Sequence, residues 1–215
     1  MKLWMLASSG IDSNSYLIYD DEKTACAVVD PSGDFYAMQD ALSELGLLSK
    51  VAIVLLTHGH FDHIELADCV RDRFNVPAAV HKLDAPMLGD AKLNLSELFG
   101  MPHVVRPAER MLTGGDEIMI GNEALRVLHT PGHTPGGVSF YAPGFGASGD
   151  TLFEGGVGRA DFPGGDMTQL LSGIRSRLLT LDDETVVWPG HGGPTVIGRE
   201  KQCNPYLGGG DAWSY

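Results

Sequence analysis

Cysteine is scarce in this chain, with only Cys26, Cys69 and Cys203 among 215 residues. Their number is odd, they are widely spaced, and no two of them form a Cys-x-x-Cys pair. This pattern argues against a disulfide framework and against a cysteine metal site. We expect Cys26 and Cys69 to be core residues.

Long apolar runs are also missing. No stretch approaches the roughly 18 to 20 consecutive apolar residues that a membrane-spanning helix requires. The N-terminus, Met-Lys-Leu-Trp, lacks the apolar segment of a secretory signal. We therefore expect a cytoplasmic protein with no membrane partner.

Basic residues are outnumbered, with 15 Lys and Arg against 28 Asp and Glu, and the formal net charge is −13. Binding to nucleic acid or to an anionic membrane requires clustered basic residues, so the composition disfavours both partners. An anionic small molecule remains compatible with this charge if divalent cations are bound in a cleft. At 43% hydrophobic residues the chain can build a sizeable core, and we expect residues 1–215 to form one domain.

The chain is organised around residues 51–63. Six apolar residues, 51–56, predict a strand buried on both faces. Four side chains with metal-binding chemistry follow within six positions: His58, His60, Asp62 and His63. Together they offer more donor atoms than one tetrahedral ion uses, which indicates two metal ions.

The remaining pattern predicts strands that alternate with helices. Runs rich in β-branched residues, bordered by turn residues, predict strands at 15–19, 24–29, 77–80, 117–120, 124–128, 138–141, 145–148 and, last, 185–188. Apolar spacing predicts helices at 35–45 and 64–74, a helical turn at 83–88, and a helix through 170–178 that Asp166 caps. We expect residues 89–110 to be a long connection with one helical turn at 93–99, and residues 151–166 to be an irregular loop. The glycine-rich tail from 207 should fray unless Trp213 and Tyr215 dock.

Three further donor residues, His133, Asp150 and His191, each follow a predicted strand. The two halves of the chain each run from a hairpin to a helix and a further strand. This indicates an α/β fold of two face-to-face sheets with helices outside, in four αββα layers, with the donors along one edge.

Seven side chains then fit a paired-metal site. One ion would be held by His58, His60 and His133, and the other by Asp62, His63 and His191, with Asp150 as the bridge. Metal binding lowers the pKa of water to about 7, so a metal-bound hydroxide would be the nucleophile and no Ser or Cys nucleophile is needed. Asp62 and Asp150 are the catalytic carboxylates on this hypothesis, and Asp62 would act as general base only in a one-metal variant. Zinc is the leading candidate, with iron or manganese as alternatives.

Residues 57–63, Thr-His-Gly-His-Phe-Asp-His, resemble the His-x-His-x-Asp-His signature of the metallo-β-lactamase fold superfamily. Residues 130–136, 158–162 and 204–207 are most similar to short, single-domain glyoxalase II-like hydrolases. The resemblance implies hydrolysis of a small-molecule thioester, with S-D-lactoylglutathione as the typical substrate, by a monomer or homodimer. We expect no C-terminal helical glutathione-binding domain of the kind that full-length glyoxalase II carries.

Other polar residues have two interpretations each. Arg159 would orient an anionic substrate or tie down its loop by bonding Asp161, and Asp161 would alternatively orient a ligand histidine. Glu65 would place an extra carboxylate near the second metal or face solvent in the first turn of a helix. We assign no metal role to three remaining histidines, His81, His103 and His129.

Rival functions stay open at this point. Persulfide dioxygenases of the same superfamily are similar through the Gly-Arg-x-Asp-Phe segment, and they would use a single iron at the equivalents of His58, His133 and Asp150. A lactonase or esterase is a further alternative, as is a binding protein without catalysis. Metal content and turnover would distinguish them.

Overall fold

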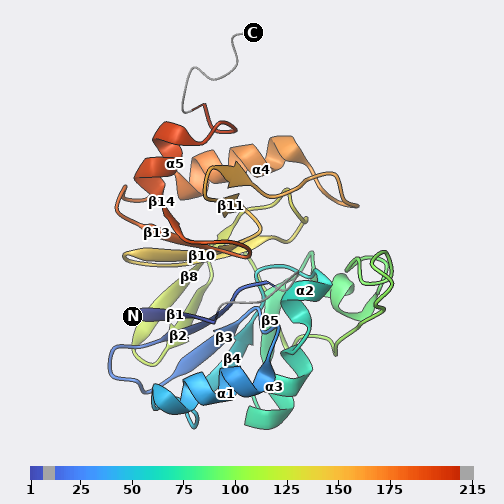
Figure 1. The fold of residues 1–215 in the computed structure, drawn as a ribbon, viewed down its shortest axis with the longest axis vertical. Coiled ribbons are helices and arrows are strands. Elements are labelled where there is room, and N and C mark those ends of the chain that lie inside the picture. Colours follow the sequence, from blue (N-terminus) through green and yellow to red (C-terminus); the bar gives the residue numbers. More distant parts are fainter. Residues whose placement is uncertain (7–12, 209–215) are drawn as a thin grey trace.

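The computed structural model describes residues 1–6 and 13–208, and the tail residues Trp213 and Tyr215 lie outside the described residues. Two six-stranded sheets stack face to face, and helices cover the outer surface of each sheet (Figure 1). The predicted four-layer αββα architecture is therefore confirmed. No helix of the described segments is long and apolar enough to cross a membrane.

The first sheet has the order β1-β2-β3-β4-β5-β6. Its strands are β1 (Lys2–Leu6), β2 (Ser15–Tyr19), β3 (Cys26–Val29), β4 (Val51–Leu55), β5 (Ala78–His81) and β6 (Arg110–Leu112). β1, β2 and β3 pair antiparallel, whereas β3 to β6 pair in parallel. The parallel strands therefore end at one common edge.

The second sheet has the order β14-β13-β10-β9-β8-β7. Its strands are β7 (Glu117–Ile120), β8 (Glu123–His129), β9 (Val138–Ala142), β10 (Phe145–Gly149), β13 (Val186–Pro189) and β14 (Thr195–Val196). Only β10 and β13 pair in parallel, and the other neighbours are antiparallel. The strands predicted at 117–120 and 124–128 are present as the antiparallel hairpin β7–β8, and those predicted at 138–141 and 145–148 as β9 and β10.

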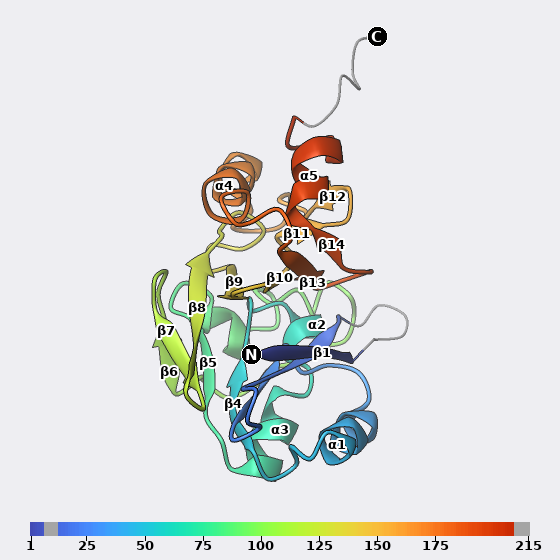
Figure 2. The same ribbon diagram turned by 90° about the vertical axis from the view of Figure 1, so that its left-hand side faces the viewer.

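The helices form the outer layers (Figure 2). On the first sheet lie α1 (Phe35–Glu44) and α3 (Ala67–Phe74), and on the second lie α4 (Met167–Gly173), which continues as the π-helix η2 (Ile174–Leu178), and α5 (Ile197–Cys203). Asp166 caps α4 as predicted, since its carboxylate accepts from the Gln169 amide. The short α2 (Phe61–Ile64) and the 3₁₀ helix η1 (Ala85–Gly89) lie at the edge where the parallel strands end.

Alternating side chains bury both faces of the first sheet. On β4, Leu55 packs in the core between the sheets, whereas Val54 packs in the core beneath α1 and α3. A third cluster, which includes Leu170 and Ile197, joins the second sheet to α4 and α5. Each fully buried aliphatic side chain contributes about 1.5–3 kcal/mol, so these layers hold the strand ends in fixed positions.

Several local predictions were wrong. The helix predicted at 64–74 is split into α2 and α3, because Leu66 leaves helical geometry between them. Residues 151–166 contain a small two-stranded sheet, β11 (Leu152–Phe153) and β12 (Gly156–Val157). Residues 93–99 form turns without a helix, and 185–188 is followed by one more strand, β14. Cys69 is exposed, because it faces outward on α3, whereas Cys26 is buried as expected.

Candidate metal centre

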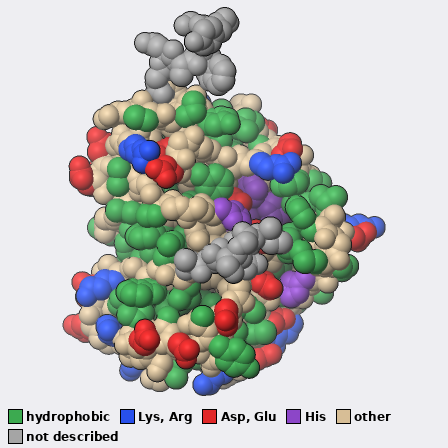
Figure 3. Space-filling view, viewed as in Figure 1, with side chains coloured by type: hydrophobic (Ala, Val, Ile, Leu, Met, Phe, Trp, Pro, Cys, Tyr) green, Lys and Arg blue, Asp and Glu red, His purple; other side chains and the backbone are tan. Residues whose placement is uncertain are grey.

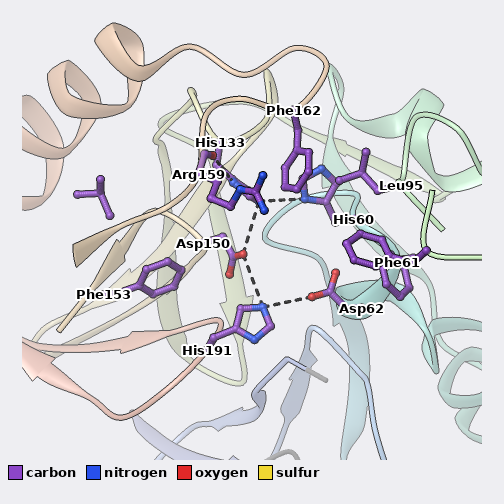
Figure 4. Close-up of a pocket in the computed structure, with 12 residues that line it drawn as sticks. His60, Phe61, Asp62, Leu95, His133, Asp150, Phe153, Arg159, Phe162 and His191 are labelled. Carbon is purple, nitrogen blue, oxygen red and sulfur yellow. Dashed lines mark hydrogen bonds and ion pairs between the residues drawn. The ribbon is translucent and has the colours of Figure 1, made fainter. Parts of the chain in front are cut away.

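The seven candidate donors come together at the shared edge of the two sheets. His58 and His60 follow β4, Asp62 and His63 lie in α2, and the last three donors, His133, Asp150 and His191, follow β8, β10 and β13 respectively. Figure 4 shows donors from both sheets pointing into one cavity. The strand-end positions that sequence analysis picked out are therefore neighbours in space.

The first donor group consists of His58, His60 and His133. One ring nitrogen from each lies within 4.8 Å of the others. Nδ1 of His60 is 2.9 Å from Nε2 of His133, so these two imidazole nitrogens converge on one point. All three rings are buried, which fits a closed set of neutral nitrogen donors.

The second donor group consists of Asp62, His63 and His191, whose donor atoms also lie within 4.8 Å of one another. Nε2 of His191 is 3.2 Å from Oδ2 of Asp62, and Nε2 of His63 is 3.7 Å from the same oxygen. The His191 side chain is 37% exposed, so this group lies nearer to solvent than the first.

Asp150 lies between the two groups. Its Oδ1 is 3.4 Å from Nε2 of His63, while its Oδ2 is 3.5 Å from Nε2 of His133 and 3.6 Å from Nε2 of His191. One carboxylate thus reaches donors of both groups, which is the position that a bridging ligand requires.

Unpaired atoms show that this constellation fits metal ions. Four buried side-chain atoms of the described residues lack a hydrogen-bond partner, and three of them belong to the candidate donors: Nε2 of His58, Nε2 of His63 and Oδ1 of Asp150. The fourth is Nε2 of His103. A buried polar atom without a partner costs about 1–3 kcal/mol, so such atoms are rare unless they serve a ligand. Nitrogen and carboxylate donors in these numbers suit zinc, iron or manganese.

Charge is distributed unevenly over the site. Burial, reinforced by neighbouring imidazoles, lowers the pKa of His58 well below its ordinary value and that of His60 to about 3. Burial acts the same way on His63, but Asp62 and Asp150 outweigh it and raise the pKa of His63 well above its ordinary value. His58 and His60 are therefore neutral imidazoles, whereas the carboxylates around His63 stabilise positive charge.

Asp30, which the sequence analysis missed, orients two of the histidines. It is fully buried, and its Oδ2 accepts from Nδ1 of His63 at 2.9 Å and from the Thr57 hydroxyl at 2.6 Å. That hydroxyl lies 3.1 Å from Nδ1 of His58 and is free to accept from it. In the neutral form of each ring, these bonds place the proton on Nδ1, so that the Nε2 lone pair faces the centre where a metal ion would displace the second proton of His63.

Asp84 is a second buried carboxylate that the sequence analysis missed. It accepts hydrogen bonds from the Gly59 amide at 3.2 Å, the Thr134 hydroxyl at 2.6 Å and the Gly136 amide at 2.6 Å. Burial raises its pKa even though these bonds oppose the shift. Asp84 therefore ties the loop of His58 and His60 to the loop of His133.

Both missed residues follow strands, Asp30 directly after β3 and Asp84 three positions after β5. The strand-end criterion that found the seven donors could have included them. A lone aspartate in such a place is more often a turn or capping residue, so the criterion alone gives no reason to select it.

Gly190 lets the last donor loop approach closely. A Cβ atom at this position would lie 2.1 Å from Oδ1 of Asp150 and 2.7 Å from Cε1 of His63. The carbonyl of Gly190 also accepts from the Asn14 amide at 2.6 Å, and the Asn14 side chain donates to the carbonyls of Pro189 and Gly192. β2 thereby helps to hold the loop that carries His191.

Arg159 and Asp161 pair with each other through two hydrogen bonds of 2.9 and 2.7 Å. Asp161 therefore does not orient His133. That role falls to the backbone carbonyl of Arg159, which accepts from Nδ1 of His133 at 2.7 Å. The tie predicted for Arg159 is present, and its guanidinium also stacks 4.2 Å from the centre of the Phe162 ring.

The other polar candidates lie outside the donor groups. Glu65 accepts from the Gly33 amide at 3.1 Å, and α2 ends just before it, so it does not lie in the first turn of a helix. His81 and His129 stack with ring centres 4.2 Å apart. His103 belongs to none of the donor groups found among the described residues.

A cavity of about 310 Å³ opens onto both donor groups. Of the described residues that line it, half are apolar, and the polar half consists of five of the candidate donors and Arg159. In Figure 3, histidine side chains reach the surface between the two halves of the molecule, with hydrophobic side chains beside them.

Comparison with known proteins identifies the class of protein that this fold and site define. Residues 9–191 match the Metallo-beta-lactamase superfamily, and the chain belongs to this family. Among curated relatives, the probable metallo-hydrolase YqgX of Bacillus subtilis is 38% identical, over 97% of this chain and 99% of the relative. The hydroxyacylglutathione hydrolase GloC of Haemophilus influenzae is 36% identical, over 96% of this chain and 98% of the relative.

Solved structures with high similarity span the whole fold. The BLEG-1 B3 metallo-beta-lactamase has a TM-score of 0.89 and 39% identity, covering 97% of this chain and 100% of its own. TTHA1623 in a di-iron-bound form has a TM-score of 0.83 and 35% identity, covering 95% and 100%. ETHE1 from Myxococcus xanthus has a TM-score of 0.77 and 29% identity, covering 97% and 85%.

Proposed function

We propose that this protein is a metal-dependent thioester hydrolase that acts on S-acylglutathione, and that the seven donor residues hold two divalent ions. The observation that carries the proposal is the position of Asp150 between two complete three-donor groups. The name of the GloC relative, a hydroxyacylglutathione hydrolase that aligns over nearly its full length, supports this choice of substrate.

The chemistry that two bound ions supply is water activation near neutral pH together with stabilisation of a developing oxyanion and of a leaving thiolate. The protein's own residues prepare this reaction. Asp30 and the carbonyl of Arg159 hold the imidazoles so that their unprotonated nitrogens face the centre. The cavity beside the donors then gives a thioester carbonyl access to the site.

The second donor group favours a hydrolase over the mononuclear iron dioxygenase considered from the sequence. A dioxygenase of that kind would use only the equivalents of His58, His133 and Asp150. Asp62, His63 and His191 would then form a converged, partly buried donor group with no role. A two-ion hydrolase uses every member of the constellation.

The test is metal stoichiometry measured together with turnover of S-D-lactoylglutathione. We expect two ions per chain, zinc first among the candidates, and loss of hydrolysis on chelation that returns when metal is restored. One iron per chain with oxygen uptake on glutathione persulfide would contradict the hydrolase. Absence of thioester, ester and lactone turnover in the metal-loaded protein would leave a binding protein.

A further inference from the structure

The cavity beside the donor groups has an unusual lining. Its apolar part consists of Phe61, Leu95, Phe99, Phe153, Val157 and Phe162. Within residues 1–6 and 13–208, the polar lining apart from the candidate donors is Arg159. Among the described residues that line the cavity there is no Ser, Thr, Asn, Gln, Tyr or Lys side chain to bind a polar substrate arm.

Arg159 is already engaged. Asp161 accepts both of its hydrogen bonds in a bidentate pair, and the Phe162 ring covers one face of the guanidinium. The pair uses two of the five guanidinium N–H groups and offsets the positive charge, so Arg159 attracts an anionic substrate group less strongly than an unpaired arginine would. Apart from the donors, the described part of the lining therefore has one group, the paired Arg159, that could hydrogen-bond a charged group or a hydroxyl.

One side of the cavity, which we call the apolar wall, consists of Phe61, Leu95 and Phe99. The rings of Phe61 and Phe99 pack with centroids 5.4 Å apart. Phe61 begins α2 and directly precedes Asp62, so the apolar wall starts beside the second donor group (Figure 4). A substrate whose carbonyl reaches the donors would have one arm against this wall.

The apolar wall is held by a buried polar network. Leu95 has a φ of +70°, a left-handed conformation that is disfavoured for a bulky side chain. Its neighbours Asn94 and Ser96 are fully buried, and they bond each other and the carbonyl of His103. The carbonyl of Asn94 also accepts from the Phe61 amide at 3.0 Å, which ties this segment to α2. The strained backbone places an apolar side chain, 4% exposed, in the cavity lining.

Resting on the thioester hydrolysis proposed above, we infer that the apolar wall selects the acyl group of the substrate. The glutathione arm of an S-acylglutathione is charged and polar, so only the acyl arm can match an apolar surface. The substrate class is then S-acylglutathiones with an apolar aliphatic acyl group. A lactoyl group is a poorer match, because its hydroxyl would lie against carbon without a hydrogen-bond partner.

The test is a series of S-acylglutathiones, from lactoyl and acetyl to butanoyl and hexanoyl, on the metal-loaded protein. A fully buried methylene corresponds to about fourfold in affinity, and a one-sided wall to about twofold. Hexanoyl has four more methylenes than acetyl, so we expect kcat/KM to rise about fifteenfold from acetyl to hexanoyl, with lactoyl below butanoyl. The rates are corrected for the intrinsic reactivity of each thioester toward free hydroxide. A flat series, or lactoyl as the best substrate, would overturn the inference while leaving the hydrolase in place.

Variants of one segment locate the effect. Phe99→Ala should reduce the hexanoyl-to-acetyl ratio about threefold or more, while Phe99→Leu should preserve most of it. Leu98→Ala is the matched control, because Leu98 is 69% exposed and does not line the cavity. An equal change in the ratio for Leu98→Ala and Phe99→Ala would count against the apolar wall.

A binding measurement separates this inference from the proposed function. S-methylglutathione and S-hexylglutathione are thioethers, so neither can be hydrolysed. The hexyl group has five more methylenes than the methyl group, so calorimetry on the metal-loaded protein should show about thirtyfold tighter binding of the hexyl compound, whether or not thioesters turn over. Equal affinities would refute the apolar wall. Failure to hydrolyse any S-acylglutathione would instead refute the proposed function.

Discussion

The two donor groups differ in charge and in exposure. The first, His58, His60 and His133, is entirely imidazole and buried. The second contains a carboxylate, and its His191 side chain is 37% exposed. An all-nitrogen group in the interior holds a cation without compensating charge of its own, so it depends on Asp150, whereas the second group supplies its own negative charge. The difference indicates one position enclosed by imidazoles and one that has its own carboxylate and lies nearer to solvent, with the cavity reaching both.

The largest expected effect comes from removing the residue that both groups share. Asp150→Ala should weaken metal binding at both positions and lower kcat/KM for thioester hydrolysis by about a thousandfold. The measurement is metal content by elemental analysis alongside turnover. Asp40→Ala, at an exposed carboxylate on α1, is the control and should change neither. Two retained ions in Asp150→Ala would show that Asp150 does not bridge.

Removing His191, the exposed donor, should abolish metal binding by the second group while the first group still binds its ion. His191→Ala leaves every member of the first group intact, so we expect one ion per chain to remain and hydrolysis to fall about a hundredfold. His133→Ala is the matched variant in the first group. If His191→Ala lost both ions, or neither, the division into two groups would be wrong.

Asp30 and Asp84, the two buried aspartates beside the donor groups, differ in how directly they contact a donor residue. Asp30 bonds the ring of His63 directly, whereas Asp84 bonds loop atoms around the first group. Loss of such an orienting contact typically weakens metal affinity 10- to 100-fold. We expect Asp30→Asn to reach the upper part of this range and Asp84→Asn the lower part. Asparagine also tolerates the positive φ of position 30, so the backbone there should persist.

Competition titrations with a chelator of known affinity measure, for each variant, the dissociation constants of the two bound metal ions. Thermal unfolding of the metal-free proteins provides the control for general destabilisation. Equal losses of metal affinity in the two variants would show that a direct bond to a donor ring contributes no more to affinity than bonds to the surrounding loops.

The strand ends explain how much of this site could be predicted from the sequence. All seven donors stand after predicted strands, and the structure brings them together, although their role as ligands stays a prediction. Asp30 and Asp84 could not be selected, since their importance arises from bonds to residues 25 to 52 positions away. The chain pattern near them indicates only a turn.

The same limit applies to the fold. The apolar runs predicted the central strands and the layered architecture, because β4 and its neighbours are covered on both faces and therefore consist largely of consecutive apolar residues. β6 and β14 have three and two residues, too few to show any periodicity, and they exist through pairing with β5 and β13. β11 and β12 are equally short, which is why glycine-rich residues 151–166 indicated an irregular loop.

The smallest expected effect concerns histidines outside both groups. Burial, together with the stacked His129, lowers the pKa of His81 to about 4, and an unfolded chain would have a value near 6.5. Between these values the unfolded state binds more protons, so this contribution to stability is complete above pH 6.5 and is lost as the pH falls toward 4. We expect the free energy of unfolding to decrease by about 2 kcal/mol more in the native protein than in His81→Asn over this window. Denaturant titrations at several pH values measure this difference. If the free energy of unfolding varied with pH equally in the native protein and in His81→Asn, the stacked histidine pair would not be the cause of the pH dependence.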